Sequence, residues 1–368
     1  HARYLSPTSI KCITPPGIVP GNVILRMSLN GQNFHRNGAL IFEYTQGARV
    51  QSIYPTSGPT SGGTLISIWG SNFRPGNASC HFDANAQIAQ VKNPNLIQCV
   101  SPSIGLNNDV QLLRLTLNGI DFLSEETPFR FVKRAHIVSA QPNICDILGG
   151  TNITVIGAGF DAAPVDANFV CRFGGADGMH TKGHFVSATR VRCTTPAHAA
   201  GPVAVDVSMN GGLDFTDDGI GFTYHAPVRM KSFFPQSGPV DGGTVIQIIG
   251  FRFYRSAGIR CRFGNAETVV AEYVNSSLIQ CTSPQHAPAS LTLFLTMNGV
   301  DFMVAEENVQ TYSYYPLLAV ASALPLRIMT SGGTMVAVRG VNFLFSPELS
   351  CLFGSTAVKA TFYRTLDR

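Results

Sequence analysis

The nine cysteines are the residues of this sequence with the clearest chemistry. Six of them form three successive pairs, separated by 19, 22 and 20 residues: Cys80 with Cys99, Cys171 with Cys193, and Cys261 with Cys281. Regular pairs of this kind in β modules point to disulfides and to an oxidising compartment. A zinc site is a poor alternative, because there is no Cys-x-x-Cys spacing and no histidine near the pairs. The sequence therefore predicts three disulfides in a secreted or cell-surface chain.

Asparagines in three Asn-x-Ser/Thr triplets are candidate N-glycosylation sites, namely Asn77, Asn152 and Asn275. Asn77 and Asn275 lie in polar turns, and Asn152 alternates with the apolar Ile153 and Val155. All three positions would leave a sugar in water, so N-linked glycans are expected.

Catalytic and metal-binding patterns are not found. His180 and His184 have metal-like spacing, but no carboxylate or cysteine accompanies them, so solvent-facing histidines are the better interpretation. Asp214, Asp217 and Asp218 lack the regular oxygen-ligand spacing of a calcium loop and indicate a turn. No Gly-x-Ser-x-Gly stands beside a plausible triad. We expect no enzyme activity, no metal and no cofactor.

The composition excludes further classes. Charged residues make up 13% of the 368 residues, the net charge is +4, and no block of Lys or Arg occurs, so the electrostatic footprint of a nucleic-acid-binding protein is missing. A hydrophobic share of 45% rules out disorder as the main state. No run of about 18 apolar residues is present, so no membrane span is expected.

Three short motifs recur with one period of about 90 residues, which indicates four repeated units. Gly-Gly-Thr ends at Thr64, Thr151, Thr244 and Thr334. Asn-Gly begins at Asn30, Asn118, Asn210 and Asn298. Cys-x-Thr/Ser-Pro begins at Cys12, Cys99, Cys193 and Cys281.

Within each unit the apolar residues alternate with a period of two, which indicates half-buried strands. After Gly-Gly-Thr the inward positions include Ile66 with Ile68 and Val336 with Val338, and before Asn-Gly they include Val205 with Val207. Asn-Gly between two such runs predicts a hairpin with a type I′ turn. Many short strands and no helical period predict an all-β chain of tandem immunoglobulin-like sandwiches.

The motifs resemble those of the IPT/TIG family of immunoglobulin-like domains. The resemblance rests on residues 55–64, Pro-Thr-Ser-Gly-Pro-Thr-Ser-Gly-Gly-Thr, followed by Gly70-Ser-Asn-Phe73, and it recurs at 235–244. The second complete unit departs from it with Asn-Ile-Cys-Asp-Ile-Leu at 143–148. The resemblance implies an adhesive or structural extracellular module, although the family also contains receptor ectodomains and a DNA-binding branch.

The repeats divide the chain into three complete domains, 47–133, 134–225 and 226–315, flanked by two halves. Residues 316–368 carry the first half of a unit and residues 1–46 carry the second half. A half sandwich exposes an apolar face and unpaired strand edges. The sequence therefore suggests that the tail of one chain is completed by the head of another, which gives a head-to-tail homopolymer and an extracellular fibre.

The expected interface of this polymer is one split core. It comprises Val23, Leu25, Met27, Leu29, Phe42 and Tyr44 from the strands around 23–29 and 39–44, and Val336, Val338 and Phe343 from the tail. Cys12 and Cys351 occupy the matched cysteine positions of the two halves, so an intermolecular disulfide is expected. Cys145 is the ninth cysteine and is left without a matched partner, as a free thiol, a further crosslink or a modified residue.

Two alternatives stay open. The chain can be an excerpt of a longer array, as in a receptor or adhesin ectodomain that binds a protein ligand. Joining residue 368 to residue 1 would place Cys351 and Cys12 29 residues apart, against 19 to 22 elsewhere, which argues mildly against a continuous array. A Rel-like DNA-binding pair is disfavoured by the cysteine pairs and by the lack of basic loops.

Overall fold

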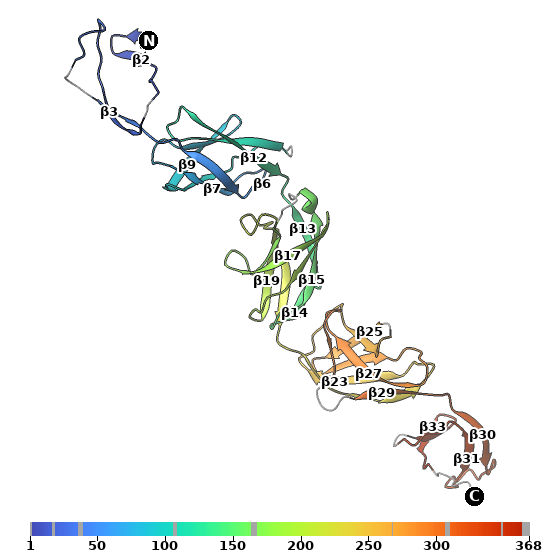
Figure 1. The fold of residues 1–368 in the computed structure, drawn as a ribbon. Helices are drawn as coiled ribbons and strands as arrows, with labels where there is room; N and C mark the ends of the chain where they lie inside the picture. Colours follow the sequence, from blue (N-terminus) through green and yellow to red (C-terminus); the bar gives the residue numbers. More distant parts are fainter. Residues whose placement is uncertain are drawn as a thin grey trace.

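The computed structural model describes residues 2–16, 19–35, 40–105, 109–162, 168–266, 268–305, 310–346 and 349–362. The described residues form strands joined by turns and loops, and these build five bodies that follow one another along an extended rod (Figure 1). The three central bodies are complete β-sandwiches, and a smaller body lies at each end. The predicted all-β fold is confirmed.

Each central body repeats one order of eight main strands. In the first domain they are β5 (Arg49–Tyr54), β6 (Ser57–Pro59), β7 (Leu65–Ser71), β8 (Ser79–Phe82), β9 (Asn85–Asn93), β10 (Leu96–Val100), β11 (Asp109–Thr116) and β12 (Phe122–Val132). One sheet has the order β5-β7-β10-β9, and the other has β9-β8-β11-β12-β6, with β6 parallel to β12. β9 pairs first with β8 and then with β10, so it passes from one sheet to the other.

The second and third domains repeat this topology. The second comprises β13 (His136–Gln141), β14 (Ile144–Asp146), β15 (Asn152–Ala158), the short 3-10 helix η1 (Phe160–Ala162), β16 (Val170–Phe173), β17 (Met179–Ser187), β18 (Arg190–Thr194), β19 (Gly201–Ser208) and β20 (Ile220–His225). The third comprises β21 (Arg229–Phe234), β22 (Ser237–Pro239), β23 (Val245–Phe251), β24 (Arg260–Phe263), β25 (Thr268–Asn275), β26 (Leu278–Thr282), β27 (Ala289–Thr296), the extra β28 (Phe302–Met303) and β29 (Thr311–Tyr315).

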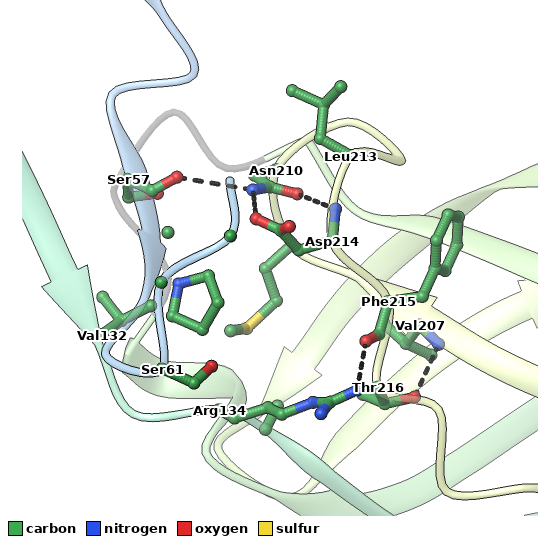
Figure 2. Close-up of a pocket in the computed structure, with 16 residues that line it drawn as sticks. Ser57, Ser61, Val132, Arg134, Val207, Asn210, Leu213, Asp214, Phe215 and Thr216 are labelled. Atoms are coloured by element: carbon green, nitrogen blue, oxygen red, sulfur yellow. Dashed lines mark hydrogen bonds between the residues drawn. The ribbon is translucent and has the colours of Figure 1, made fainter. Parts of the chain in front are cut away.

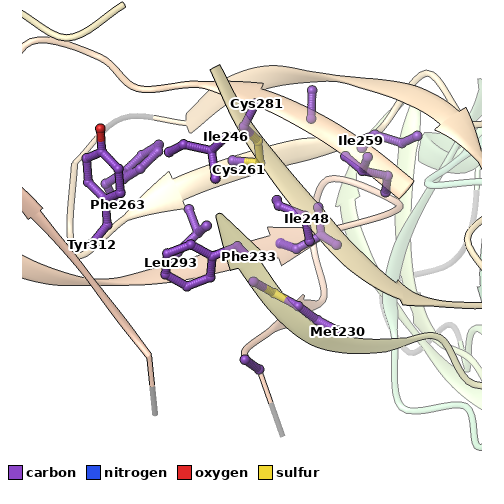
Figure 3. Packing of buried hydrophobic residues seen from close by; sticks show 14 of the residues in the cluster. Met230, Phe233, Ile246, Ile248, Ile259, Cys261, Phe263, Cys281, Leu293 and Tyr312 are labelled. Atoms are coloured by element: carbon purple, nitrogen blue, oxygen red, sulfur yellow. A yellow bond between two sulfur atoms is a disulfide. The ribbon is translucent and has the colours of Figure 1, made fainter. Parts of the chain in front are cut away.

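The alternating apolar residues fill the space between the two sheets of each domain. Ile246 and Ile248 of β23 are fully buried, as are Ile66 and Ile68 of β7. One disulfide crosses each core from β8, β16 or β24 to β10, β18 or β26, and joins Cys80 to Cys99, Cys171 to Cys193, and Cys261 to Cys281. Figure 3 shows the third of these within its apolar cluster. A loop of about 20 residues closed in this way stabilises a domain by roughly 3 kcal/mol in the chain-entropy model.

The two end bodies hold complementary strands of the same topology. The first has β1 (Ala2–Ser6), β2 (Ser9–Cys12), β3 (Gly21–Leu25) and β4 (Leu40–Tyr44), and the last has β30 (Ala319–Leu324), β31 (Ala337–Val341), β32 (Ser350–Phe353) and β33 (Thr356–Lys359). The registers identify each strand. Ala2 pairs with Cys12 as Ala89 pairs with Cys99, and Cys351 pairs with Val358 as Cys80 pairs with Gln87.

The end bodies are shorter than the alternation predicts. β3 ends at Leu25, so Met27 and Leu29 follow the strand, and β31 begins at Ala337, so Val336 precedes it. The equivalent β7 pairs along its first residues with β10, whereas the counterpart of β10 is β2, at the other end of the rod. β31 lacks this neighbouring strand within the described chain, so its first residues have no hydrogen-bonding partner and the strand begins later, at Ala337. Ala39 and residues 363–368, also in the predicted halves, lie outside the described residues.

The predicted type I′ turn at Asn-Gly is wrong. That turn needs positive φ at both central residues, but only the glycines have it, as at Gly119 with φ 77°. The Asn118 side chain closes the loop instead, because its Oδ1 accepts the backbone N–H groups of Ile120 and Asp121 at 3.0 and 2.8 Å. Asparagine favours this Asx turn, in which a side chain takes the place of a backbone acceptor.

Candidate functional site

Gly-Gly-Thr and Cys-x-Thr/Ser-Pro meet at one end of each complete domain. In the first domain, the Thr64 N–H donates to the Ser101 Oγ at 3.1 Å, and the Gly63 N–H donates to the Ser101 carbonyl at 3.0 Å. Gly62 has φ +72°, and a Cβ there would lie 2.5 Å from the Pro102 carbonyl carbon. Only glycine fits this position, which explains why the two motifs recur together.

The same arrangement recurs in the other two complete domains. The Thr151 N–H donates to the Thr195 Oγ1, and the Thr244 N–H donates to the Ser283 Oγ, each at 3.1 Å. In the first and third domains the threonine hydroxyl lies close to Gly58 of β6 or Gly238 of β22, the short strands that begin seven residues earlier. Each complete domain presents the same polar surface at this end.

The Asn-Gly loop of the following domain docks onto this surface. At the first joint, the Thr64 Oγ1 donates to the Asp214 Oδ2 at 2.7 Å. The Asn210 Nδ2 donates to the same Oδ2 at 2.7 Å and to the Ser57 carbonyl at 3.4 Å, as Figure 2 shows for Ser57, Asn210 and Asp214. We call this set of hydrogen bonds, from a threonine and an asparagine to one aspartate and from the asparagine to a carbonyl, the joint contact.

The second joint contains the same contact. The Thr151 Oγ1 donates to the Asp301 Oδ2 at 2.5 Å, and the Asn298 Nδ2 donates to that oxygen at 2.8 Å and to the Ile144 carbonyl at 3.2 Å. Thr64 and Asp214 are 150 residues apart, and so are Thr151 and Asp301. Both threonines are buried, with exposures of 0 and 2%. The joint is therefore a repeated and specific domain–domain contact.

The sequence alone did not identify this contact. The spacing of Asp214 predicts only a turn, and no motif distinguishes Asp301. The available signal was an aspartate three or four residues after each Asn-Gly asparagine of the complete domains, at Asp121, Asp214 and Asp301. This recurring aspartate gave no indication of the threonine that it contacts, because that threonine lies in the preceding domain.

Further polar contacts surround the first joint. The Tyr54 hydroxyl donates to the Asn210 carbonyl at 3.3 Å. The Arg134 guanidinium donates to the Phe215 carbonyl at 3.0 Å (Figure 2). The Ile137 N–H donates to the Asp218 carboxylate at 2.6 Å. A cavity of about 290 Å³ lies between residues 57–63 of the first domain and residues 210–216 of the second. It is at the lower limit of small-molecule sites, which run from about 300 Å³, so this surface is suited to domain contact.

Cys145 lies beneath the second joint as an unpaired thiol with 1% exposure. Its Sγ donates to the Asp146 carbonyl at 3.2 Å. Burial raises its pKa to about 11, although hydrogen bonds from Thr195 and Thr151 oppose the shift. A protonated, buried thiol is a poor nucleophile, so Cys145 acts as a packing residue.

The predicted polymer interface lies at both ends of the rod and is not brought together within one chain (Figure 1). Leu25, Met27 and Phe42 are 53, 47 and 38% exposed, whereas their counterparts Leu113, Leu115 and Phe129 are buried. Val336, Val338 and Phe343 are half-buried, and Val23 and Leu29 are exposed. Tyr44 is half-buried and donates its hydroxyl to the Pro15 carbonyl at 2.8 Å. Cys12 and Cys351 are unpaired in this chain.

The remaining candidate residues lie on the surface. Asn77, Asn152 and Asn275 are all exposed, as an attached glycan requires. His180 contacts the ring of Phe215, with ring centroids 5.3 Å apart. In the part of the chain that the structure describes, no group of three His, Cys, Asp or Glu side chains could hold a metal ion. The same residues include no helix with the length and apolar character of a membrane span.

Comparison with known proteins identifies the repeated domain. The model of the IPT/TIG domain family matches residues 48–131, 135–224 and 227–314. Human fibrocystin-L is 25% identical over 319 residues, which cover 85% of this chain and 7% of that protein. Mouse plexin-B2 is 28% identical over 214 residues, which cover 56% of this chain and 11% of that protein. The chain thus spans a small part of these relatives.

Among solved structures, the full extracellular region of plexin A4 is similar over 86% of this chain and 28% of its own length. The TM-score is 0.41 and the identity is 16%. Stable disulfides form in oxidising environments, and the three disulfides together with the relatedness to plexins and fibrocystin-L show that the chain is extracellular.

Proposed function

Because the chain belongs to the IPT/TIG domain family, we propose that it is part of a receptor or adhesin ectodomain that binds a protein ligand. The observation that carries this proposal is the joint contact, which recurs between consecutive domains and holds them at defined relative positions. Tandem domains joined by polar contacts without long linkers are suited to present a binding surface at a fixed distance from a cell.

The relatives support a receptor more than a fibre. Fibrocystin-L and the plexins match across several successive domains of this chain. No metal or cofactor is needed for binding of this kind.

Cell binding tests the proposal. Fluorescent beads coated with the 368-residue chain should bind a subset of cell types, and trypsin treatment of those cells should abolish binding. Beads coated with reduced and alkylated chain serve as the control, because they carry the same sequence without the folded domains. Binding that survives trypsin, or no binding to any of a broad set of cell types, would contradict a protein ligand.

A second candidate function is the subunit of an extracellular glycoprotein fibre, assembled head to tail by completion of a split sandwich. The observation that favours it is the complementarity of the end bodies. β30–β33 match β5, β7, β8 and the first part of β9, while β1–β4 match the second part of β9 and β10–β12. Open apolar faces such as those of Leu25 and Phe42 are costly in water.

Deletion of residues 1–46 tests this second candidate. The deletion should abolish polymers in electron micrographs and leave the three central domains folded, as measured by their thermal unfolding. Disulfide mapping of the unreduced protein should yield a peptide that joins Cys12 to Cys351. Polymers that persist after the deletion would contradict strand completion.

A further inference from the structure

The outer face of one sheet in the second domain carries a cluster of basic side chains. The sheet has the order β13-β15-β18-β17. Arg190 and Arg192 are exposed on β18, where they alternate with the buried Val191. The register places the exposed His184 of β17 opposite Arg192, and the exposed Lys182 lies two positions earlier on the same side of β17. We call these four side chains the basic face.

The other two complete domains have no basic residue at the equivalent positions. The strand registers align the domains, because Gly183 pairs with Cys193 as Ala89 pairs with Cys99 and as Ala271 pairs with Cys281. The equivalents of the basic face are Ile88, Gln90, Leu96 and Gln98 in the first domain, and Val270, Glu272, Leu278 and Gln280 in the third. The same strands therefore form without these cations, so the basic face is not a requirement of the fold.

The basic face does not follow from the overall charge of the domain either. Residues 134–225 contain eight acidic residues, all Asp, against five Lys and Arg. Two of these five cations have partners elsewhere in the domain, since Arg172 pairs with Asp206 at 2.8 Å and Arg134 donates to the Phe215 carbonyl at 3.0 Å. The remaining three all belong to the basic face.

No carboxylate neutralises the basic face from within its own sheet. The four strands β13, β15, β17 and β18 contain neither Asp nor Glu. Among the described residues, no carboxylate lies within ion-pair distance of Lys182, His184, Arg190 or Arg192. Cations gathered without counter-charges on one face of an otherwise acidic domain create a local positive potential, which attracts an anionic ligand.

The spacing of the cations suits an extended polyanion. Residues two apart on a strand are separated by about 6.7 Å, and neighbouring strands lie about 4.8 Å apart, so the basic side chains stand in two short rows. Arginine donates paired N–H groups to the oxygens of an oxyanion such as sulfate. A linear chain with repeated sulfate groups can contact several of these side chains at once, whereas a single ion contacts one or two. Such chains are the sulfated polysaccharides of the extracellular space.

The candidate glycosylation site Asn152 borders the basic face and does not lie within it. Asn152 is exposed and pairs with Thr194, and the next outward pair along the sheet is Thr154 with Arg192. Arg190 lies one outward position farther from Asn152. A sugar on Asn152 thus stands at one end of this sheet face, and the basic side chains extend away from it.

We propose that the basic face of the second domain binds a sulfated glycosaminoglycan. The contact is electrostatic and made at exposed side chains, so it weakens as the salt concentration rises. This inference goes beyond both candidate functions, because it concerns a polysaccharide ligand and a single domain of one chain.

Binding to immobilised heparin, measured by surface plasmon resonance, tests the proposal. The glycosylated chain secreted from mammalian cells is compared with the double variant Arg190→Leu/Arg192→Gln, which introduces the residue types that the first domain has at these positions. Arg49→Gln/Lys92→Gln is the matched control, because it removes the same charge from exposed positions on β5 and β9 of the first domain. Thermal unfolding verifies that both variants are folded.

The Arg190→Leu/Arg192→Gln variant should bind heparin at least about tenfold more weakly than the wild type, and the control should stay within about twofold of it. Heparin stripped of its sulfate groups should not compete for the wild-type chain. Equal affinities of the wild type and the Arg190→Leu/Arg192→Gln variant, or no binding of the glycosylated wild type, would overturn the proposal. Competition by polyglutamate as strong as that by heparin would also overturn it, and would assign the basic face to acidic protein segments.

Discussion

The joint contact predicts that the second domain stabilises the first through one carboxylate. We consider Asp214→Ala, which removes the acceptor of the Thr64 hydroxyl without changing any residue of the first domain. Hydrogen bonds to charged groups contribute about 1.5–3 kcal/mol. Asp214 is half-buried, so we use the lower end, about 1.5 kcal/mol.

The single tryptophan makes the effect measurable in the whole chain. Trp69 lies on β7 of the first domain and is 40% exposed, so its fluorescence reports the unfolding of that domain alone. With a urea m-value of about 2 kcal/mol/M, loss of about 1.5 kcal/mol lowers the Trp69 midpoint by about 0.7 M. Asp301→Ala is the matched control, because it breaks the second joint and should leave this midpoint unchanged.

A double-mutant cycle separates the pair from other effects. Thr64→Val and Asp214→Ala should each lower the midpoint, and the double variant should be no worse than the poorer single variant, with a coupling energy near 1.5 kcal/mol. A coupling below about 0.5 kcal/mol, or an Asp214→Ala midpoint equal to that of the wild type, would refute the assignment of the joint contact as a stabilising interaction.

Three further predictions concern single residues. Gly62→Ala should destabilise the first domain by more than about 2 kcal/mol in the Trp69 assay, because its Cβ would lie 2.5 Å from the Pro102 carbonyl carbon. Gly63→Ala, which has φ +91° and open space around it, should cost about 1 kcal/mol, and equal costs for the two variants would contradict the close approach at Gly62. Burial raises the pKa of Cys145 to about 11, so the protonated thiol stabilises the folded state fully below the unfolded pKa of about 8.5, and this stabilisation is lost as the pH rises toward 11. Cys145→Ala should remove that part of the pH dependence of the thermal unfolding temperature. An unchanged dependence in the variant would contradict the raised pKa. The Arg172 guanidinium lies 2.8 Å from the Asp206 carboxylate, and their side chains are 13 and 3% exposed, respectively. Asp206→Ala should therefore destabilise the second domain by about 3–5 kcal/mol in calorimetry, because it leaves Arg172 without its partner. A loss below about 1 kcal/mol would contradict a buried ion pair.

Features that depend on local pattern and on repetition could be predicted from the amino-acid sequence. Alternation at Ile66 and Ile68 predicted buried strand positions, and matched spacing paired Cys80 with Cys99, because each signal lies within one unit and recurs in the next. The same repetition predicted complementary halves at 1–46 and 316–368, and the structure describes strand registers in both segments.

The contacts that cross from one unit to another became visible in the folded chain. Thr64 and Asp214 are 150 positions apart, and the sequence of neither loop indicates that the other is its partner. The turn at Asn118 also depends on a side-chain acceptor that composition does not specify. Val336 and Met27 lie outside the strands that their alternation predicts, because a strand needs a neighbour to extend, and the neighbour of each lies at the far end of the rod. The local sequence pattern indicates which residues face inward. The neighbouring strand determines how far a strand extends, and the neighbouring domain determines which hydrogen bonds a loop makes.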